Sequence, residues 1–273
     1  MSKIPAVVLK RLTSAVPKFK KILARAKERD VNESDTVTII TDMIEEIFGF
    51  DKYSDVTREY GIQGTYCDLA IKTNKKIEYL IEVKAIGLEL NSKHLKQAVN
   101  YASREGIKWV VLTNGMKWEI HRVSLEDKVQ NEKIFTIDFT DLNPKHKEQQ
   151  ELLFLLCKRG VQKDLIGDYY EYKQSVNRHT IGALLLTDSV SNAVRKELRL
   201  LKPGIKVDVK EINDLIKNEV LKREILDSEA GIEASKQVAR YLKKRAKAKT
   251  TPKVKVTAPT ASPVDDPPIL PQY

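Results

Sequence analysis

The 273-residue chain has few of the residues that would support disulfide, metal-thiolate or membrane chemistry. Its two cysteines, Cys67 and Cys157, fall in a predicted strand and a distant predicted helix, without the spacing of metal ligands. We therefore predict two buried free thiols. No run of about 18 apolar residues could span a bilayer, and residues 3–8 lack the long apolar segment and cleavage site of a secretory signal. These absences predict a cytoplasmic protein that does not associate with membranes.

Two common kinds of catalytic motif are also missing. The sequence contains no Gly-x-x-x-x-Gly-Lys-Ser/Thr phosphate loop, so we predict no nucleotide cofactor and no ATP-driven motor. The four histidines, His94, His121, His146 and His179, show no zinc-ligand grouping. Any chemistry therefore has to come from carboxylates, lysines and other polar side chains.

What the chain has in excess is positive charge. With 48 Lys and Arg against 38 Asp and Glu, its formal net charge is +10, which favours attraction to a polyanion such as nucleic acid. Basic residues crowd segments 18–29 and 243–249. Each segment could contact phosphates or form an ordinary solvated helix face, and the sequence leaves both interpretations open.

The most informative stretch is 64–101, where three charges interrupt apolar, β-branched strands. Asp68 lies in the first strand, and Glu82 and Lys84 lie in the second. A lone charge in a core strand is costly unless it is paired or bound to a metal. Two carboxylates, the carbonyl of Val83 and water would give Mg²⁺ the oxygen ligands it prefers. The alternative is a structural ion cluster in which the same charges satisfy one another.

Further polar residues accompany these three. Gln97 and Tyr101 are one turn apart on the following predicted helix, and Glu33 stands in an Asn-Glu-Ser-Asp segment at the start of an earlier helix. With Asp68 and the Glu-Val-Lys triplet, they resemble the PD-(D/E)xK nuclease core found at the N-terminus of type I restriction-enzyme R subunits. The resemblance covers residues 31–123.

This resemblance implies a Mg²⁺-dependent DNA endonuclease in which Mn²⁺ can substitute. Asp68, Glu82 and the Val83 carbonyl would hold the metal, and Lys84 would orient or deprotonate the attacking water. Glu33 would approach the metal cluster, while Gln97 and Tyr101 would support the site. The missing phosphate loop departs from full-length R subunits, so a restriction or defence-type nuclease without a motor is expected.

The expected fold is a restriction-endonuclease-like mixed sheet flanked by helices and followed by an α-helical domain. A helix over 92–104 and a strand over 109–113 are among the clearest elements, and Pro17 is expected to kink or divide the first helix. The predicted domains are a basic helical arm, a nuclease-like core, a helical domain and a disordered tail, at 1–30, 31–142, 143–249 and 250–273.

Two other functions fit the same sequence. A non-catalytic protein built on an inactive nuclease core would bind DNA with a steep salt dependence and never cut it. A protein-interaction scaffold would oligomerise through its C-terminal helices. A nuclease with one site per chain would favour a homodimer if it cuts both strands.

Overall fold

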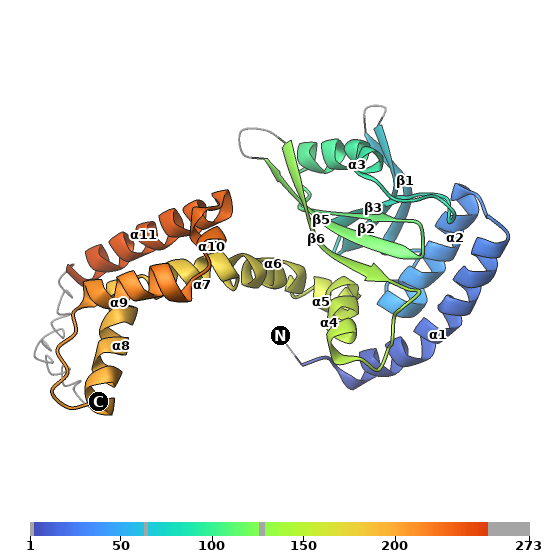
Figure 1. Ribbon diagram of the computed structural model, residues 1–273. Helices are drawn as coiled ribbons and strands as arrows, with labels where there is room; N and C mark the ends of the chain where they lie inside the picture. The colour runs from blue at the N-terminus through green and yellow to red at the C-terminus, as the bar shows by residue number, and fades with distance from the viewer. Residues whose placement is uncertain (1–2, 63–64, 126–128, 251–273) are drawn as a thin grey trace, which may run out of the picture. The chain divides into compact units, whose positions relative to one another are not determined.

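The computed structural model describes residues 3–62, 65–125 and 129–250 of a chain that divides into two compact units (Figure 1). The first unit is Met1–Gln174 and the second is Ser175–Tyr273. The first contains a six-stranded mixed sheet with helices, and the second is helical over its described residues. This confirms a mixed α/β fold followed by a helical region. The tail predicted for 250–273 lies outside the described residues except for Thr250. Over the described residues, no helix is long and apolar enough to cross a membrane.

The six strands lie side by side in the order in which they occur along the chain. Every neighbouring pair is antiparallel except β3 and β4, which are parallel. Parallel neighbours need a crossover connection, and helix α3 supplies it. The strands are β1 (Val56–Ile62), β2 (Thr65–Thr73), β3 (Lys76–Val83), β4 (Trp109–Thr113), β5 (Lys117–Leu125) and β6 (Val129–Asp138).

Helices cover both faces of this sheet. Helix α3 (Ser92–Arg104) packs on one face, where its apolar residues join Leu80 and Leu112 in one cluster. Helices α1, α2 and α4 lie on the opposite face, as Figure 1 shows, and share a larger cluster with Ile81 and Val111. The predicted helix over 92–104 and strand over 109–113 are both confirmed.

Helix α1 (Ala6–Glu28) is part of this larger core rather than a separate arm. Its buried residues include Val16, Phe19 and Leu23, which belong to the same cluster as the sheet. Pro17 lies inside the helix, which continues through it, so of the two expected effects a division is wrong and a kink stays a prediction. Burial of the flanking apolar side chains outweighs the cost of a proline in a helix, about 3 kcal/mol.

Helix α2 (Glu33–Met43) and the π-helical turn η1 (Ile44–Phe48) form one continuous segment beside the sheet. Asn32 caps the start, because its side chain accepts a hydrogen bond from the Asp35 amide at 2.9 Å. Gly49, with φ of +78°, ends it. Arg11 of α1 donates to the carbonyls of Ile47 and Phe48 at 3.0 and 3.2 Å, which ties the two helices together.

The first unit extends past the predicted boundary at residue 142. Leu153–Leu156 of α4 are buried in the same cluster as the sheet, and Cys157 lies beside them. The division between the units falls after Gln174 instead. The three helices of this segment are α4 (Lys147–Leu156), α5 (Lys158–Val161) and α6 (Leu165–Ser175).

The second unit combines short helices with two longer ones, α8 and α11, around a small core. The buried apolar side chains of its core cluster are Ala183, Ala234 and Val238. Many larger apolar side chains are exposed, including Leu201 at 83%. The helical elements are α7 (Arg178–Leu185), α8 (Asp188–Leu201), α9 (Val209–Leu215), η2 (Ile216–Val220), α10 (Arg223–Asp227) and α11 (Glu229–Thr250).

Candidate active site

The two carboxylates among the predicted metal ligands, Asp68 and Glu82, meet where strands β2 and β3 stop pairing. Their register runs from Thr73 opposite Lys76 to Leu69 opposite Ile81. Beyond this last pair, the amide of Val83, two residues after Ile81, donates to Oδ2 of Asp68, the residue before Leu69, at 2.7 Å. A carboxylate thus takes a hydrogen bond that a strand carbonyl would normally accept, and this bond holds Asp68 beside the end of β3.

Both carboxylates lie on the side of the sheet that helix α3 covers. Side chains alternate along a strand, so Asp68 shares its face with Ala70, and Glu82 shares its face with Leu80. Ala70 and Leu80 both lie in the cluster under α3. Glu82 is also paired with Leu112, another member of that cluster. The sequence prediction that Asp68 and Glu82 lie near each other at adjacent strand ends agrees with this arrangement.

Lys84 links Glu82 to helix α2. Its Nζ lies 2.8 Å from Oε1 of Glu82 and 3.2 Å from Oε2 of Glu33. The side chains of Lys84 and Glu82 are 15% and 10% exposed, whereas that of Glu33 is 48% exposed. The Lys84 amide donates to the Thr113 carbonyl at 2.8 Å, which extends the pairing with β4 to this position. Two carboxylates predicted from sequence, Glu82 and Glu33, therefore contact one ammonium group, and Asp68 lies beside them through its bond to the Val83 amide.

Burial and charge shift the proton equilibria of this cluster. Burial, reinforced by the charge of Asp68 and opposed by the hydrogen bond from Lys84, raises the pKa of Glu82 to about 7. For Lys84, burial lowers the pKa, but the hydrogen bond and charge of Glu82 together with the charge of Glu33 outweigh it, so the pKa is raised. Of the two roles predicted for Lys84, this favours a cation that orients water or stabilises charge over a base.

The donor set fits a hard divalent cation. When all are ionised, Glu33, Asp68, Glu82 and Lys84 carry three negative charges and one positive, a net charge of −2, and a cation would offset it. Over the described residues, no group of three His, Cys, Asp or Glu side chains could by itself hold a metal ion. An ion here would therefore use Asp68, Glu82, the Val83 carbonyl and water, all of them the oxygen ligands that Mg²⁺ prefers.

Gln97 and Tyr101 come from the same helix but have different surroundings. Tyr101 is 2% exposed and packs in the cluster beneath α3. Gln97, one turn earlier, is exposed. Gln97 is therefore accessible to a large ligand, whereas Tyr101 acts as part of the packing that holds α3 on the sheet. Their predicted support of the site stays a prediction.

The family comparison bears on this part of the chain. Residues 38–137 match the family described as the type I restriction enzyme R protein N terminus. The match confirms the resemblance inferred from sequence. No curated protein and no solved structure matches the chain, so the restriction-endonuclease-like form of the sheet stays a prediction.

The R protein N-terminal match includes most of the predicted site. It spans Asp68, Glu82, Lys84, Gln97 and Tyr101, and it begins shortly after Glu33. The matched residues contain α3 and most of the sheet. The similarity to R protein N termini therefore applies to the segment that carries the clustered charges.

Gly87 and Asp30 lie close together next to this cluster, an approach that sequence reasoning missed. A Cβ atom on Gly87, in the loop after β3, would collide with Oδ1 of Asp30, in the turn before α2. Asp30 itself has φ of +47°, an uncommon conformation for a residue other than glycine. Gly87 follows Lys84 by three residues and Asp30 precedes Glu33 by three, so this close approach lies next to the ion pair of Lys84 with Glu33. The only signal in the sequence is a glycine shortly after the Glu-Val-Lys triplet.

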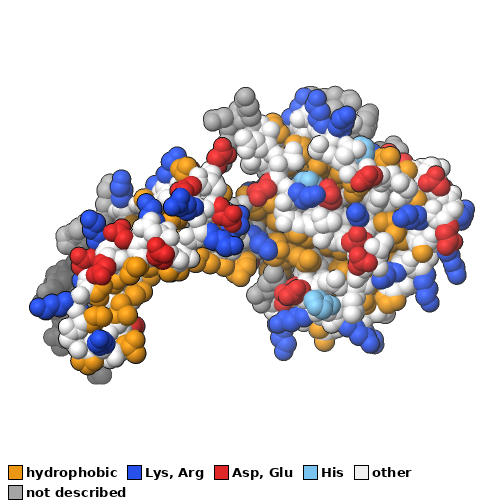
Figure 2. Space-filling view, viewed as in Figure 1, with side chains coloured by type: hydrophobic (Ala, Val, Ile, Leu, Met, Phe, Trp, Pro, Cys, Tyr) orange, Lys and Arg blue, Asp and Glu red, His pale blue; other side chains and the backbone are white. Residues whose placement is uncertain are grey.

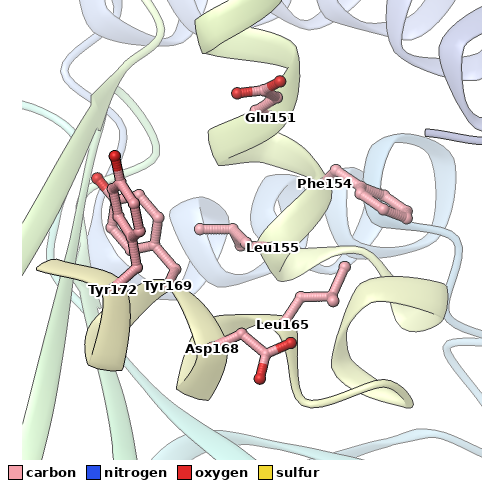
Figure 3. Close-up of a pocket in the computed structure, with 7 residues that line it drawn as sticks. All are labelled: Glu151, Phe154, Leu155, Leu165, Asp168, Tyr169 and Tyr172. Carbon is pink, nitrogen blue, oxygen red and sulfur yellow. The ribbon is translucent and has the colours of Figure 1, made fainter. Parts of the chain in front are cut away.

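A cavity elsewhere in the first unit contains none of the predicted site residues. It has a volume of about 390 Å³ and lies between α4 and α6, as Figure 3 shows. Its lining residues are Glu151, Phe154, Leu155, Leu165, Asp168, Tyr169 and Tyr172. The charged cluster instead lies at the strand ends, outside this cavity.

Proposed function

We propose that this protein is a metal-dependent DNA endonuclease of the restriction type that hydrolyses phosphodiester bonds. The observation that carries the proposal is the meeting of Asp68, Glu82, Lys84 and Glu33 at one end of the sheet. The similarity of residues 38–137 to R protein N termini makes DNA the expected substrate. The 273 residues contain no phosphate loop, so the proposed cutting does not depend on a motor within them.

Each side chain has a distinct role in this proposal. Asp68, Glu82 and the Val83 carbonyl would hold Mg²⁺ or Mn²⁺, which supplies Lewis-acid stabilisation of charge on the phosphate when bound. The Lys84 ammonium orients the attacking water and stabilises negative charge that develops on the phosphate oxygens. Glu33 contacts this ammonium from the α2 side and fixes its position. Gln97 contacts the DNA from the surface of α3.

One observation favours a second function, DNA binding without cleavage on an inactive nuclease core. Glu82 already has Lys84 as a partner, and Asp68 already accepts from the Val83 amide. A cluster that satisfies itself in this way needs no metal. The two functions differ in whether DNA is cut and in whether a divalent cation stabilises the fold.

The direct test is cleavage of supercoiled, linear and single-stranded DNA with Mg²⁺ or Mn²⁺. Asp68→Ala and Lys84→Ala should each lower the rate at least about 100-fold, as removal of a group that stabilises transition-state charge does. Lys18→Ala is the matched control, since Lys18 also forms an ion pair, 2.6 Å from Glu46, but on α1. Equal cutting by all three proteins and wild type would remove Asp68 and Lys84 from the chemistry. Saturable binding by every protein with no cutting would favour the second function.

Partners and location belong to the same proposal. One candidate site per chain cuts one strand at a time, so cleavage of both strands at one place would call for a homodimer. Light scattering of the full chain with and without a duplex measures this directly. A cytoplasmic location, where DNA is accessible, stays a prediction.

A further inference from the structure

The outer face of helix α3 has an unusual charge composition. The helix contains Lys93, Lys96 and Arg104 but no aspartate or glutamate. Its exposed polar side chains recur every three or four residues, so they form one stripe along the helix. We call this stripe the α3 face, and its members are Lys93, Lys96, Gln97, Asn100 and Arg104. Figure 2 shows basic side chains gathered over α3.

The cations of the α3 face are not neutralised by neighbouring carboxylates. Among the ion pairs formed by described residues, none includes Lys93, Lys96 or Arg104. The nearest acidic residues in sequence, Glu89 and Glu105, flank the helix rather than lie within it. Three positive charges are therefore available to an external anion.

The basic residues of α1, which are denser in sequence, are partly engaged within the protein. Lys18 lies 2.6 Å from a carboxylate oxygen of Glu46. Lys20 donates to the carbonyl of Leu142 at 3.1 Å. Helix α1 also packs on the face of the sheet opposite α3, through the larger of the two clusters.

The position of the candidate site decides between these two basic surfaces. Asp68 and Glu82 lie on the side of the sheet that helix α3 covers, whereas α1 packs on the other side, so α3 is the basic surface on the side of these carboxylates. From Lys93 to Arg104 the helix rises about 16 Å, a length of duplex that carries roughly ten phosphate charges. The stripe is therefore long enough for each of its three cations to contact a different phosphate.

We propose that the α3 face, rather than the basic stretch of α1, binds the phosphate backbone of the DNA next to the candidate site. Lys93, Lys96 and Arg104 neutralise phosphates, and the amides of Gln97 and Asn100 donate hydrogen bonds to backbone oxygens. Such contacts position the duplex without reading its sequence. The inference rests on DNA as the substrate, but it requires no particular chemistry at Lys84.

The test compares two triple variants that remove equal charge. One is Lys93→Gln, Lys96→Gln and Arg104→Gln on α3. The other is Lys21→Gln, Arg25→Gln and Lys27→Gln on α1, whose side chains are also exposed. Binding of a fluorescent 30-base-pair duplex is measured by anisotropy without divalent cations at several KCl concentrations. Loss of three phosphate contacts should reduce the slope of log K against log salt by about 2.7 and weaken binding by up to about 500-fold at 0.1 M salt.

The α1 triple should bind with the wild-type slope. Equal losses in both triples would mean that net charge alone attracts DNA, and a wild-type slope in the α3 triple would overturn the inference. A Lys93→Gln, Lys96→Gln double variant should lose about 1.8 from the slope, which checks the result with fewer changes. Wild type that binds through α3 but never cuts would refute the proposed nuclease and leave this inference standing. Cleavage by wild type, together with normal DNA binding by the α3 triple, would support the proposed nuclease and refute this inference.

Discussion

Replacement of Glu82 by glutamine should stabilise the metal-free protein at alkaline pH. Glu82 is buried close to Asp68, and its pKa is raised from 4.5 to about 7. A carboxyl group with a raised pKa binds its proton more tightly in the folded than in the unfolded protein. Its ionisation therefore works against the fold, and a neutral glutamine removes that penalty.

The size and pH range of the effect follow from the shift. Below about pH 4.5 Glu82 is protonated in both states and costs nothing. As the pH rises from 4.5 through about 7, the folded protein loses stability relative to the unfolded chain, because the unfolded chain releases the Glu82 proton first. The pKa change from 4.5 to about 7 corresponds to about 3 kcal/mol of unfolding free energy above pH 8. The glutamine variant also loses the contact of the carboxylate with Lys84, so we expect a net gain of about 1–2 kcal/mol at pH 8 and little change at pH 4.5.

Urea unfolding monitored by tryptophan fluorescence from pH 4.5 to 8.5 measures this difference. Glu46→Gln serves as the control, because Glu46 pairs with Lys18 at the surface, where an ion pair contributes at most about 1 kcal/mol. Added Mg²⁺ should stabilise wild type at pH 8 more than the Glu82→Gln variant, since binding to the native state shifts the unfolding equilibrium. Two results together would show that Glu82 is an internal ion-pair partner. The Glu82→Gln protein would be less stable than wild type at pH 8, and added Mg²⁺ would change the stability of neither protein.

Three further outcomes test the packing around the site. Arg11→Met should lower the unfolding free energy by about 1–2 kcal/mol in urea titrations, since it leaves two main-chain carbonyls at the end of η1 without their donor; an unchanged midpoint would contradict this. Gly87→Ala should change the melting temperature little, because the new methyl group meets only the terminal Oδ1 of the exposed Asp30 side chain, which can turn away; a clear loss that Asp30→Ala restores would show that this carboxylate is held in place. Cys67 and Cys157 should be silent to a thiol reagent at pH 8 until urea unfolds the chain, since burial raises the pKa of both thiols; rapid labelling of either in the native protein would show that it is accessible.

The central part of the fold could be predicted because its signals are local. The strand that carries Glu82 and Lys84 combines β-branched residues with charges that have no place in an ordinary core strand. Helix α3 shows a clear period, and its predicted bounds at 92 and 104 are those of the structure. In both segments propensity, periodicity and turn residues agree, and such agreement makes a local prediction reliable.

What could not be predicted depends on contacts between segments that are distant in sequence. The apolar spacing of Val16, Phe19 and Leu23 was visible, but nothing local showed that they pack against the sheet. The boundary predicted at residue 142 was likewise local, whereas the compact unit continues to Gln174 because Leu153–Leu156 pack in the same cluster as the sheet. Periodicity identifies which face of a helix is apolar, and only the assembled fold shows what covers that face.

The same limit explains why charge density along the sequence cannot choose between the two basic surfaces proposed to attract DNA. Segment 18–29 contains more cations than α3, and although Lys18 and Lys20 have partners within the protein, Lys21, Arg25 and Lys27 are exposed, so the side of the sheet decides. The three cations of α3 form no ion pair among the described residues, and α3 covers the side of the sheet on which Glu82 lies. A charge attracts a ligand effectively when it is both uncompensated and on the side from which the ligand arrives, and both conditions are set by tertiary structure. Charge counts along a sequence therefore suggest the class of partner, while strand alternation at Asp68 and Glu82 supports the place at which we propose that this partner binds.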